Sequence, residues 1–555
     1  MKDLTTRLSR KIRRFHARHA RSGSKALSSR PFISGDTFKS LADHSYDGTG
    51  SFDPKKVKEG DIVFIKTDLV HGFFEKMHPS IDASYRIITH NSDRRVGEKE
   101  AGLIDGKVIR WYAQNAAVSH PKLTPIPIGL ENMSYFENGI VGIFEGLRRK
   151  AVPKKNRILS AFSVGTNPQE RGEALAALRR SPVADILPDR PEPSEYLSTL
   201  QSYKFVAAPE GNGPDSHRIW EAAALGAIPI AKKTRLLEHF HSLGLPILFI
   251  DDWKDVEAFS EQQLEALYSK IMLTCGPVAD NLVMFHYWQG IVRAPEDKRD
   301  EFLVCVAIGH KFRQSYERDF KESHERFAYD LRRPLVVIGD FIQKVDKRPT
   351  WQKLVMFKTP ILAKVDRVML LDADIYVKDT GESPLDFVPE GQWGLAPNNA
   401  FDLPTLAVTD LTLYAQCPPE NRPSFVMNCG FFIVSQKAHR KVMEYVFESY
   451  GEQICDEQGP FNYHLINEYK GVVLPFRFNN IVGSYMEKYG YSMTTVMNMY
   501  AQTNSFHFAG RANRKIFRII RLFREHPAFY SIAAFPPVLA VLDAASKLVK
   551  EAKGI

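Results

Sequence analysis

The sequence predicts an α/β protein with two successive units, the first of them two-lobed. From about position 60, apolar runs of strand length alternate with helical patterns, and many runs end in polar residues. Charged, proline-containing segments at 148–155 and 293–301 interrupt this alternation, which is typical of boundaries between compact parts. The predicted parts are a tail over 1–40, a first unit over 58–295 with lobes 58–147 and 156–295, a second unit over 300–515, and a terminal segment over 516–555.

The net charge of +9 is concentrated at the two ends of the 555-residue chain. Residues 1–30 carry a net +9 and residues 511–524 a net +6, so the rest of the chain is acidic by six charges. An acidic body does not suit a nucleic-acid groove, whereas basic ends suit an anionic membrane surface. The five cysteines have no metal-ligand spacing, which indicates a reducing compartment and predicts no disulfide framework.

Both ends combine basic and apolar residues at helical spacing. Leu4, Leu8, Ile12 and Phe15 recur among arginines, so the N-terminal tail is expected to be either an interfacial amphipathic helix or a disordered basic segment. The stretch from Ile516 to Leu542 is similar, but its prolines make it too interrupted to span a bilayer. It is expected to be an interfacial anchor, with a packed terminal helix as the alternative.

In the first lobe, polar residues follow strands that read as buried. "GDIVFIKTDLV" ends in Thr67 and Asp68, and "YRIITHNSD" ends in His90 and Asp93. Ligands collect beyond the carboxyl ends of the strands in an open parallel sheet. His90, Asp93 and Asp68 are therefore candidates for a general base, with Asp93 favoured over the other two.

The stretch "SYKFVAAPEGNGPDSHRIWEAAALGAIPI" at 202–230 is the most informative part of the first unit. A strand leads through a loop with two glycines into a helix that starts near Ser216 with Arg218 in its first turn. Backbone N–H groups at such a helix start bind anions, and Arg218 adds a bidentate donor. Glu221 lies three residues further on, where it could accept hydrogen bonds from a ribose. Arg171 is either a second phosphate contact or part of a surface salt bridge.

This stretch resembles the exostosin family, which carries a similar "P-x-G-N-G-x-D-x-H-R-x-W-E-A" segment. The resemblance implies a GT-B fold, in which a nucleotide sugar is held between two Rossmann-like lobes. It also implies that Asn212, Gly213, Arg218 and Glu221 contact the donor. Glu210 stands where the family often has a basic residue.

In the second unit, "KVDRVMLLDADIYV" places Asp372 and Asp374 at the end of a strongly apolar strand. Residues i and i+2 of a strand share a face, and paired carboxylates suit Mn²⁺ or Mg²⁺, which bridges the phosphates of a nucleotide sugar. Three later pieces add to this pair. They are Asn428 and Gly430 in a strand, Glu457, Gln458 and Asn462 at a helix start, and His507 with Gly510 in "SFHFAG".

Together these pieces resemble the family-8-type GT-A glycosyltransferases, the group of glycogenin and bacterial lipopolysaccharide galactosyltransferases. The resemblance covers about 300–515 and implies a mixed-sheet nucleotide-sugar domain with Asp372, Asp374 and His507 as metal ligands. It places Asn428, Glu457 and Gln458 around the sugar, with Glu457 and Gln458 in catalytic positions, and Gly510 beside the phosphates. The chain departs from that family by Glu457 in place of Asp and by "RANRK" in place of Lys-Pro-Trp.

The resulting expectation is a bifunctional enzyme of hexosyltransferase type that uses nucleotide sugars, with UDP-sugars favoured. Its acceptor would be a growing surface polysaccharide or a lipid-linked glycan, and its location cytoplasmic, peripheral at the inner membrane face. Only the second unit is expected to need a metal. One alternative is a single active GT-A transferase with a degenerate, acceptor-binding first unit. Another is a lectin-like or scaffold protein without catalysis.

Overall fold

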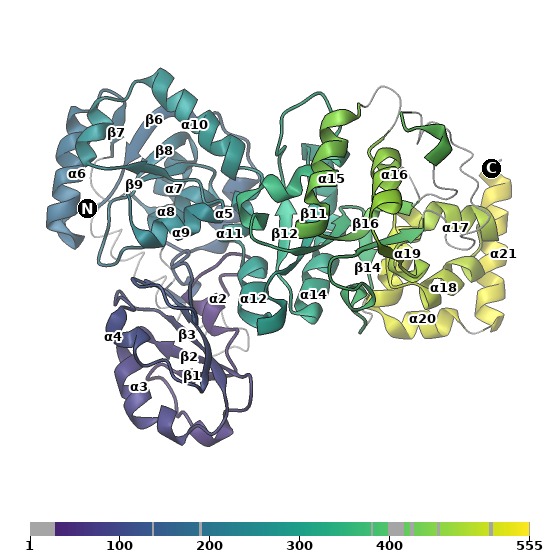
Figure 1. Ribbon diagram of the computed structural model, residues 1–555, viewed down its shortest axis with the longest axis horizontal. Helices are drawn as coiled ribbons and strands as arrows, with labels where there is room; N and C mark the ends of the chain where they lie inside the picture. The colour runs from purple at the N-terminus through teal and green to yellow at the C-terminus, as the bar shows by residue number, and fades with distance from the viewer. Residues whose placement is uncertain are drawn as a thin grey trace. The chain divides into compact units, whose positions relative to one another are not determined.

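The computed structural model describes residues 28–135, 138–187, 191–378, 381–397, 416–421, 427–451, 456–509, 514–534 and 536–553. The chain is a mixed α/β protein that divides after Val292 into two compact units (Figure 1). We refer to them as the first unit and the second unit and describe each by itself.

The first lobe of the first unit is built on a parallel sheet of five strands in the order β1-β2-β3-β4-β5. Its central strands are almost continuously buried, as expected for a parallel sheet covered on both faces. The strands are β1 (His44–Tyr46), β2 (Ile62–Lys66), β3 (Tyr85–His90), β4 (Val108–Ala113) and β5 (Leu123–Pro125). The helices are α2 (Gly35–Lys39), α3 (Val70–Lys76) and α4 (Glu98–Ala101).

The predicted tail over 1–40 extends too far, because residues 34–39 already belong to the folded first lobe. Ser34 caps α2, whose Phe38 is fully buried and stacks on His90 at 5.4 Å. β1 then adds a strand to the sheet before the predicted domain start at 58. The polar residues of this segment act as caps and turns, which is why their composition resembles that of a tail. Residues 1–27, on which the predicted amphipathic helix falls, lie outside the described residues.

The second lobe has its own parallel sheet, in the order β10-β9-β8-β6-β7. Its strands are β6 (Lys155–Ser160), β7 (Ala184–Ile186), β8 (Tyr203–Ala207), β9 (Ile228–Lys232) and β10 (Leu248–Ile250). Its helices are α5 (Val141–Arg148), α6 (Pro168–Arg180), α7 (Pro193–Gln201), α8 (His217–Ala224), α9 (Arg235–Ser242), α10 (Glu261–Cys275) and α11 (Ala279–Val283). Helix α8 ends at Ala224 and is followed by Gly226, whose φ of +69° favours glycine.

The predicted second lobe over 156–295 includes a helix that belongs with the first lobe. α12 (Phe285–Arg293) returns to the first lobe, where the N–H of Phe285 donates to Pro31 O at 2.8 Å. The hydroxyl of Tyr112 in β4 donates to Ile291 O at 3.1 Å. α12 therefore ties the end of the first unit to its beginning.

The second unit is built on a mixed sheet of six strands in the order β12-β11-β13-β16-β15-β17. β11, β12 and β13 run parallel, whereas β16 is antiparallel to both β13 and β15. The strands are β11 (Glu301–Val306), β12 (Leu335–Ile338), β13 (Arg367–Asp372), β15 (Trp393–Pro397), β16 (Met427–Ser435) and β17 (Gly471–Val473). A small second sheet joins β14 (Ile375–Val377), β19 (Ser505–His507) and β18 (Asn480–Ile481).

Helices of the second unit flank these sheets, and the C-terminal helices gather beside α17 and α18 (Figure 1). They are α13 (His310–Asp319), α14 (Lys321–Leu331), the 3₁₀ helix η8 (Pro349–Lys358), α15 (Gln436–Ser449), α16 (Gln458–Glu468), α17 (Val482–Tyr489) and α18 (Met493–Gln502). α19 (Arg514–Glu525), α20 (Pro527–Ala533) and α21 (Pro536–Lys553) follow. α19 buries Ile516, Ile520 and Phe523 in the core of this unit, so the boundary predicted at 515/516 divides a packed helix.

Candidate functional sites

The small sheet of the second unit brings His507 close to Asp372 and Asp374. β13 carries Asp372 to the edge of the core, and the turn that follows it presents Asp374. β14 pairs antiparallel with β19 so that Ile375 lies opposite His507. One ligand atom from each of Asp372, Asp374 and His507 lies within 4.8 Å of the others. The three predicted metal ligands thus converge although His507 is more than 130 residues away in the sequence.

The chemistry of this set fits a divalent cation of the Mn²⁺ or Mg²⁺ kind. Two carboxylates supply hard oxygen atoms, and Nε2 of His507 lies 3.3 Å from Oδ1 of Asp374. Burial raises the pKa of Asp372, and the adjacent charge of Asp374 adds to the effect. Burial alone would also raise the pKa of Asp374, but His507 outweighs it and holds that pKa below its usual value. A cation bound beside Asp372 and Asp374 would therefore reduce the repulsion between their carboxylates.

Gly430 allows β16 to pass close to these ligands. A Cβ atom at this position would lie 2.3 Å from Cε1 of His507 and 3.0 Å from Oδ2 of Asp372. Contacts this short would force the histidine to move, so the glycine is required by space rather than by backbone angle. This explains why a glycine follows Asn428 by two residues in the middle of a fully buried strand.

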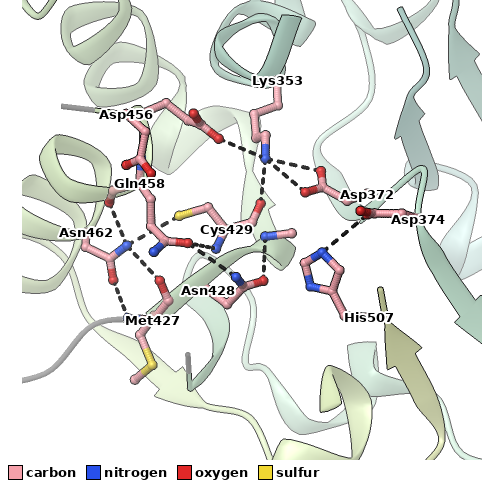
Figure 2. Close-up of polar contacts among 12 residues, drawn as sticks. Lys353, Asp372, Asp374, Met427, Asn428, Cys429, Asp456, Gln458, Asn462 and His507 are labelled. Atoms are coloured by element: carbon pink, nitrogen blue, oxygen red, sulfur yellow. Dashed lines mark hydrogen bonds and ion pairs between the residues drawn. The ribbon is translucent and has the colours of Figure 1, made fainter. Parts of the chain in front are cut away.

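Lys353 is a buried cation of this site that was not predicted from the sequence (Figure 2). Its ammonium lies 3.1 Å from Oδ1 of Asp372 and 3.1 Å from Oε1 of Glu457, and it donates to Cys429 O at 2.9 Å. Burial alone would lower the pKa of Lys353, but the two carboxylates outweigh it and raise that pKa. Burial would likewise raise the pKa of Glu457, yet Lys353 holds it below its usual value. Both groups are therefore charged at neutral pH.

The predicted sugar-contacting residues are joined in one hydrogen-bond network (Figure 2). Oε1 of Gln458 accepts from Nδ2 of Asn428 at 3.3 Å and from the N–H of Cys429 at 3.1 Å. Oδ1 of Asn428 accepts from the N–H of Gly430 at 2.9 Å and from Nδ2 of Asn479 at 2.8 Å. The network fixes the orientation of Asn428 beside the carboxylate and histidine set. Gly510 lies outside the described residues.

Asn462 has a structural part in this network. It accepts from the N–H of Met427 at 2.8 Å and donates to Met427 O at 3.0 Å. Both bonds clamp the start of β16 to helix α16, and the side chain is fully buried. Asn462 therefore positions the strand that carries Asn428 and Gly430.

In the first unit, the residues predicted from 202–230 line one cavity of about 1080 Å³. The cavity is bounded by the start of α8, the loop after β6 and helices α6 and α7. Its lining includes every site residue predicted for this unit, namely Asp93, Arg171, Asn212, Gly213, Arg218 and Glu221. Residues from both lobes thus meet at a single site.

Arg171 and Arg218 give this cavity a positive wall. Arg171 is buried and donates to two backbone carbonyls, Glu210 O at 3.0 Å and Ser163 O at 2.9 Å. Arg218 donates to Ala161 O at 2.7 Å, and both guanidinium groups lie about 6 Å from the ring of Phe162. In the part of the chain that the structure describes, neither has a carboxylate within 4.0 Å, so the surface salt bridge considered for Arg171 is wrong.

The electrostatics of this wall favour an anionic ligand. Burial lowers the pKa of Arg171 to about 10, and the nearby charge of Arg218 adds to the effect. Burial also raises the pKa of Glu221, one turn along α8. Nε of Arg218 and Oγ of Ser216 are buried without a hydrogen-bond partner among the described residues. Unpaired donors beside two close positive charges suit an anion.

Asp93 is the candidate base that reaches the cavity. Its carboxylate accepts from Nδ2 of Asn212 at 3.0 Å, which joins the two lobes. His90 is buried instead, its Nε2 donating to Pro127 O at 3.0 Å, and burial lowers its pKa to about 4. Asp68 is held by Lys66 and Arg94. His90 and Asp68 are not among the residues that line the cavity.

Two further residues of the 202–230 stretch hold the lobes together. Asp215 accepts from the N–H of Ile128 and from Nε1 of Trp220, both at 2.8 Å, and burial raises its pKa to about 6. Nδ1 of His217 lies 2.7 Å from Gly129 O. Both residues belong to the "PDSH" run at 214–217, but their contacts with the other lobe were not predicted from the sequence.

Comparisons with known proteins give little further information. No family model and no curated protein matches the chain. Among solved structures it is similar to a glycosyltransferase involved in the glycosylation of the major capsid of PBCV-1, with 12% identity and a TM-score of 0.27. That likeness covers 40% of this chain and 99% of the other chain. A TM-score this low does not establish a shared fold.

Proposed function

We propose that the protein is a glycosyltransferase whose second unit transfers a sugar from a nucleotide-sugar donor with the help of a divalent metal ion. The observation that carries the proposal is the convergence of Asp372, Asp374 and His507 within 4.8 Å, next to Asn428 and Gln458. Mn²⁺ or Mg²⁺ held by these three residues would stabilise the diphosphate leaving group of a UDP-sugar or a related donor.

The protein's own residues have distinct parts in this proposal. Asn428 and Gln458 are oriented by the network around β16 and would bind hydroxyl groups of the donor sugar. Glu457, paired with Lys353, keeps its charge next to them and would stabilise positive charge that develops on the sugar ring. Lys353 holds Asp372 and Glu457 in place and offsets their mutual repulsion.

For the first unit we propose a second donor site that works without a metal. Arg171, Arg218 and the start of α8 would hold the diphosphate, and Glu221 the ribose. Asn212 and Gly213 complete the loop that leads into this helix. Asp93 would accept the proton of the acceptor hydroxyl in this site. The acceptor shared by both units would be a growing glycan or a lipid-linked glycan.

One observation favours an alternative with a single active unit. Asp93 is hydrogen-bonded to Asn212, while His90 and Asp68 are engaged elsewhere, so the first unit has a binding cavity but no unencumbered base among these three. In that case the first unit binds a donor or acceptor and the second unit catalyses.

A donor screen tests the proposal. The full chain is incubated with a panel of nucleotide sugars in Mn²⁺ or in EDTA, and release of the nucleoside diphosphate is measured for wild type, Asp372→Asn and Arg218→Met. Two active units would be supported if the chain releases nucleoside diphosphate from two donors, if each variant abolishes release from a different donor, and if only one of the two reactions needs Mn²⁺. Loss of all release in Asp372→Asn would leave the first unit without independent activity. Absence of nucleotide binding by calorimetry in every form would contradict the proposal and support a scaffold.

A further inference from the structure

The C-terminal helices expose apolar side chains and include a stretch of sequence without charged residues. Residues 527–542 contain no Asp, Glu, Lys or Arg. α20 and the start of α21 lie within this stretch, directly after the basic helix α19. Within the described residues no single helix is long and apolar enough to cross a bilayer. α20 and Pro536–Ala544 reach that threshold only as a pair bent by 83°.

The apolar stripe of α19 is not available to a membrane, which changes the sequence expectation for this segment. Ile516, Ile520 and Phe523 are buried against the body of the second unit. The opposite side of α19 exposes Lys515, Arg518 and Leu522, which are spaced as on one helix face. Glu525 continues this face and is paired with Arg521, so the face keeps a net positive charge.

One side of the α20–α21 pair is fixed to the body of the unit. Tyr530 packs on Tyr500 with ring centroids 5.0 Å apart, and Ala533 is buried. The carboxylate of Asp543 accepts from the N–H of Met493 at 2.5 Å, at the start of α18. The pair is therefore held in position against the body of the second unit.

Both helices of the pair also expose large apolar side chains. Phe529 is 43% exposed, Ile532 is 61% exposed and Val541 is 68% exposed. Phe529 and Ile532 are three residues apart and share a face of α20. We call Phe529, Ile532 and Val541 the apolar tip. An exposed apolar group of this kind marks an interaction surface.

We propose that the apolar tip inserts into the headgroup region of an anionic lipid bilayer, with Lys515 and Arg518 contacting lipid phosphates. The absence of charge over 527–542 suits the lipid side, and the positive face of the adjacent helix provides the charge complementarity. The bend and the fixed inner side limit the contact to the interface, so the segment lies on the membrane and does not span it. This inference is independent of the proposed function.

Vesicle flotation of the full chain tests the inference. Wild type should float with vesicles containing about one third phosphatidylglycerol and not with pure phosphatidylcholine vesicles. Phe529→Ser/Ile532→Ser/Val541→Ser should reduce the apparent affinity by at least about tenfold, because each side chain contributes apolar area. Lys515→Glu/Arg518→Glu should reduce it in the anionic vesicles as well. The control is Val345→Ser, at a valine of the same unit that is 45% exposed.

The other outcomes would overturn the inference. If the triple variant floats as well as wild type, the contact lies elsewhere in the chain, for instance in its basic N-terminal residues. If wild type does not float but forms a dimer that the triple variant loses, the tip binds a second copy. Circular dichroism and release of nucleoside diphosphate from a soluble donor should be unchanged in the triple variant, which separates loss of membrane contact from loss of fold or catalysis.

Discussion

The ammonium of Lys353 lies 3.1 Å from a carboxylate oxygen of Asp372 and equally close to one of Glu457. The side chains of Lys353 and Glu457 are only 2% and 8% exposed. One buried cation thus links the end of β13 to the start of α16, on which the proposed donor site depends.

Lys353→Met should destabilise the second unit. The substitution leaves the carboxylates of Asp372 and Glu457 without their shared counter-charge. Breaking a buried ion pair in this way lowers the free energy of unfolding by about 3–5 kcal/mol. Thermal or urea unfolding measures the effect. The control Lys358→Met breaks a pair with the exposed Glu448 and should cost no more than about 1 kcal/mol. The double variant Lys353→Met/Glu457→Gln should recover part of the loss, and no recovery would contradict the proposed pairing.

Gly430→Ala should weaken Mn²⁺ binding while the fold is kept. The added Cβ would lie 2.3 Å from Cε1 of His507, so the imidazole has to leave its present position beside Asp374. A displacement of this kind is expected to reduce metal affinity by about 10- to 100-fold. Titration with Mn²⁺ alone measures it. Gly451→Ala, where a Cβ meets nothing within 4 Å, is the matched control, and equal affinities in the two variants would refute the steric argument.

Arg218→Met should reduce nucleotide binding by the first unit. The guanidinium has no carboxylate within 4.0 Å among the described residues, so its charge is available to a diphosphate. Calorimetry with UDP in EDTA, in an Asp372→Asn background, isolates this cavity from the second unit. The affinity should fall by at least about tenfold, as for a lost charge-assisted hydrogen bond. Arg180→Met, at an exposed arginine paired with Glu257, should bind like its parent, and a comparable loss there would point to nonspecific charge.

His90 should make the first unit sensitive to mild acid. Its Nε2 donates to Pro127 O, and its Nδ1 accepts from the N–H of Asn91 at 2.8 Å, so the neutral ring satisfies both partners. Burial lowers its pKa to about 4 from an ordinary value of 6.5. Because the folded state resists protonation of His90, the contribution of this residue to stability is fully present above pH 6.5 and is lost as the pH falls toward 4. This contribution is about 3 kcal/mol in the free energy of unfolding.

Urea unfolding of wild type and His90→Gln at several pH values measures this contribution. The difference between the two proteins should shrink as the pH falls from 7 to 4, since glutamine does not titrate. His324 and His439 have similarly lowered pKa values and remain in both proteins, so they cancel in the comparison. A difference that does not change with pH would show that His90 is not responsible.

Local patterns in the sequence predicted most of the strands and most of the residues that the structure brings together at the two candidate sites. Asp372 and Asp374 follow a continuous apolar strand, and the "SFHFAG" segment predicted His507 as their partner. The parallel sheets of the first unit followed from buried runs that end in polar residues. These features depend on residues close in sequence or on motifs with fixed spacing.

Contacts between distant segments could not be predicted in the same way. Lys353 lies in an apolar 3₁₀ segment, and its contact Cys429 is 76 residues away, so the local pattern does not show which residues it pairs with. The return of α12 to the first lobe depends on partners such as Tyr112 and Ile291, 179 residues apart. The buried α2 was assigned to a tail because its capping residues are those of a polar loop.

Mn²⁺-dependent release of nucleoside diphosphate by Asp374→Asn tests the central claim most directly. The full chain, Asp374→Asn and the exposed control Asp386→Asn are assayed with the donor that wild type hydrolyses best, over a Mn²⁺ titration. The predicted result is that wild type and Asp386→Asn are activated alike, while the metal-dependent activity of Asp374→Asn falls by at least about a hundredfold, or 2.7 kcal/mol. Unchanged Mn²⁺ activation in Asp374→Asn would contradict a metal-dependent transferase centred on Asp372, Asp374 and His507.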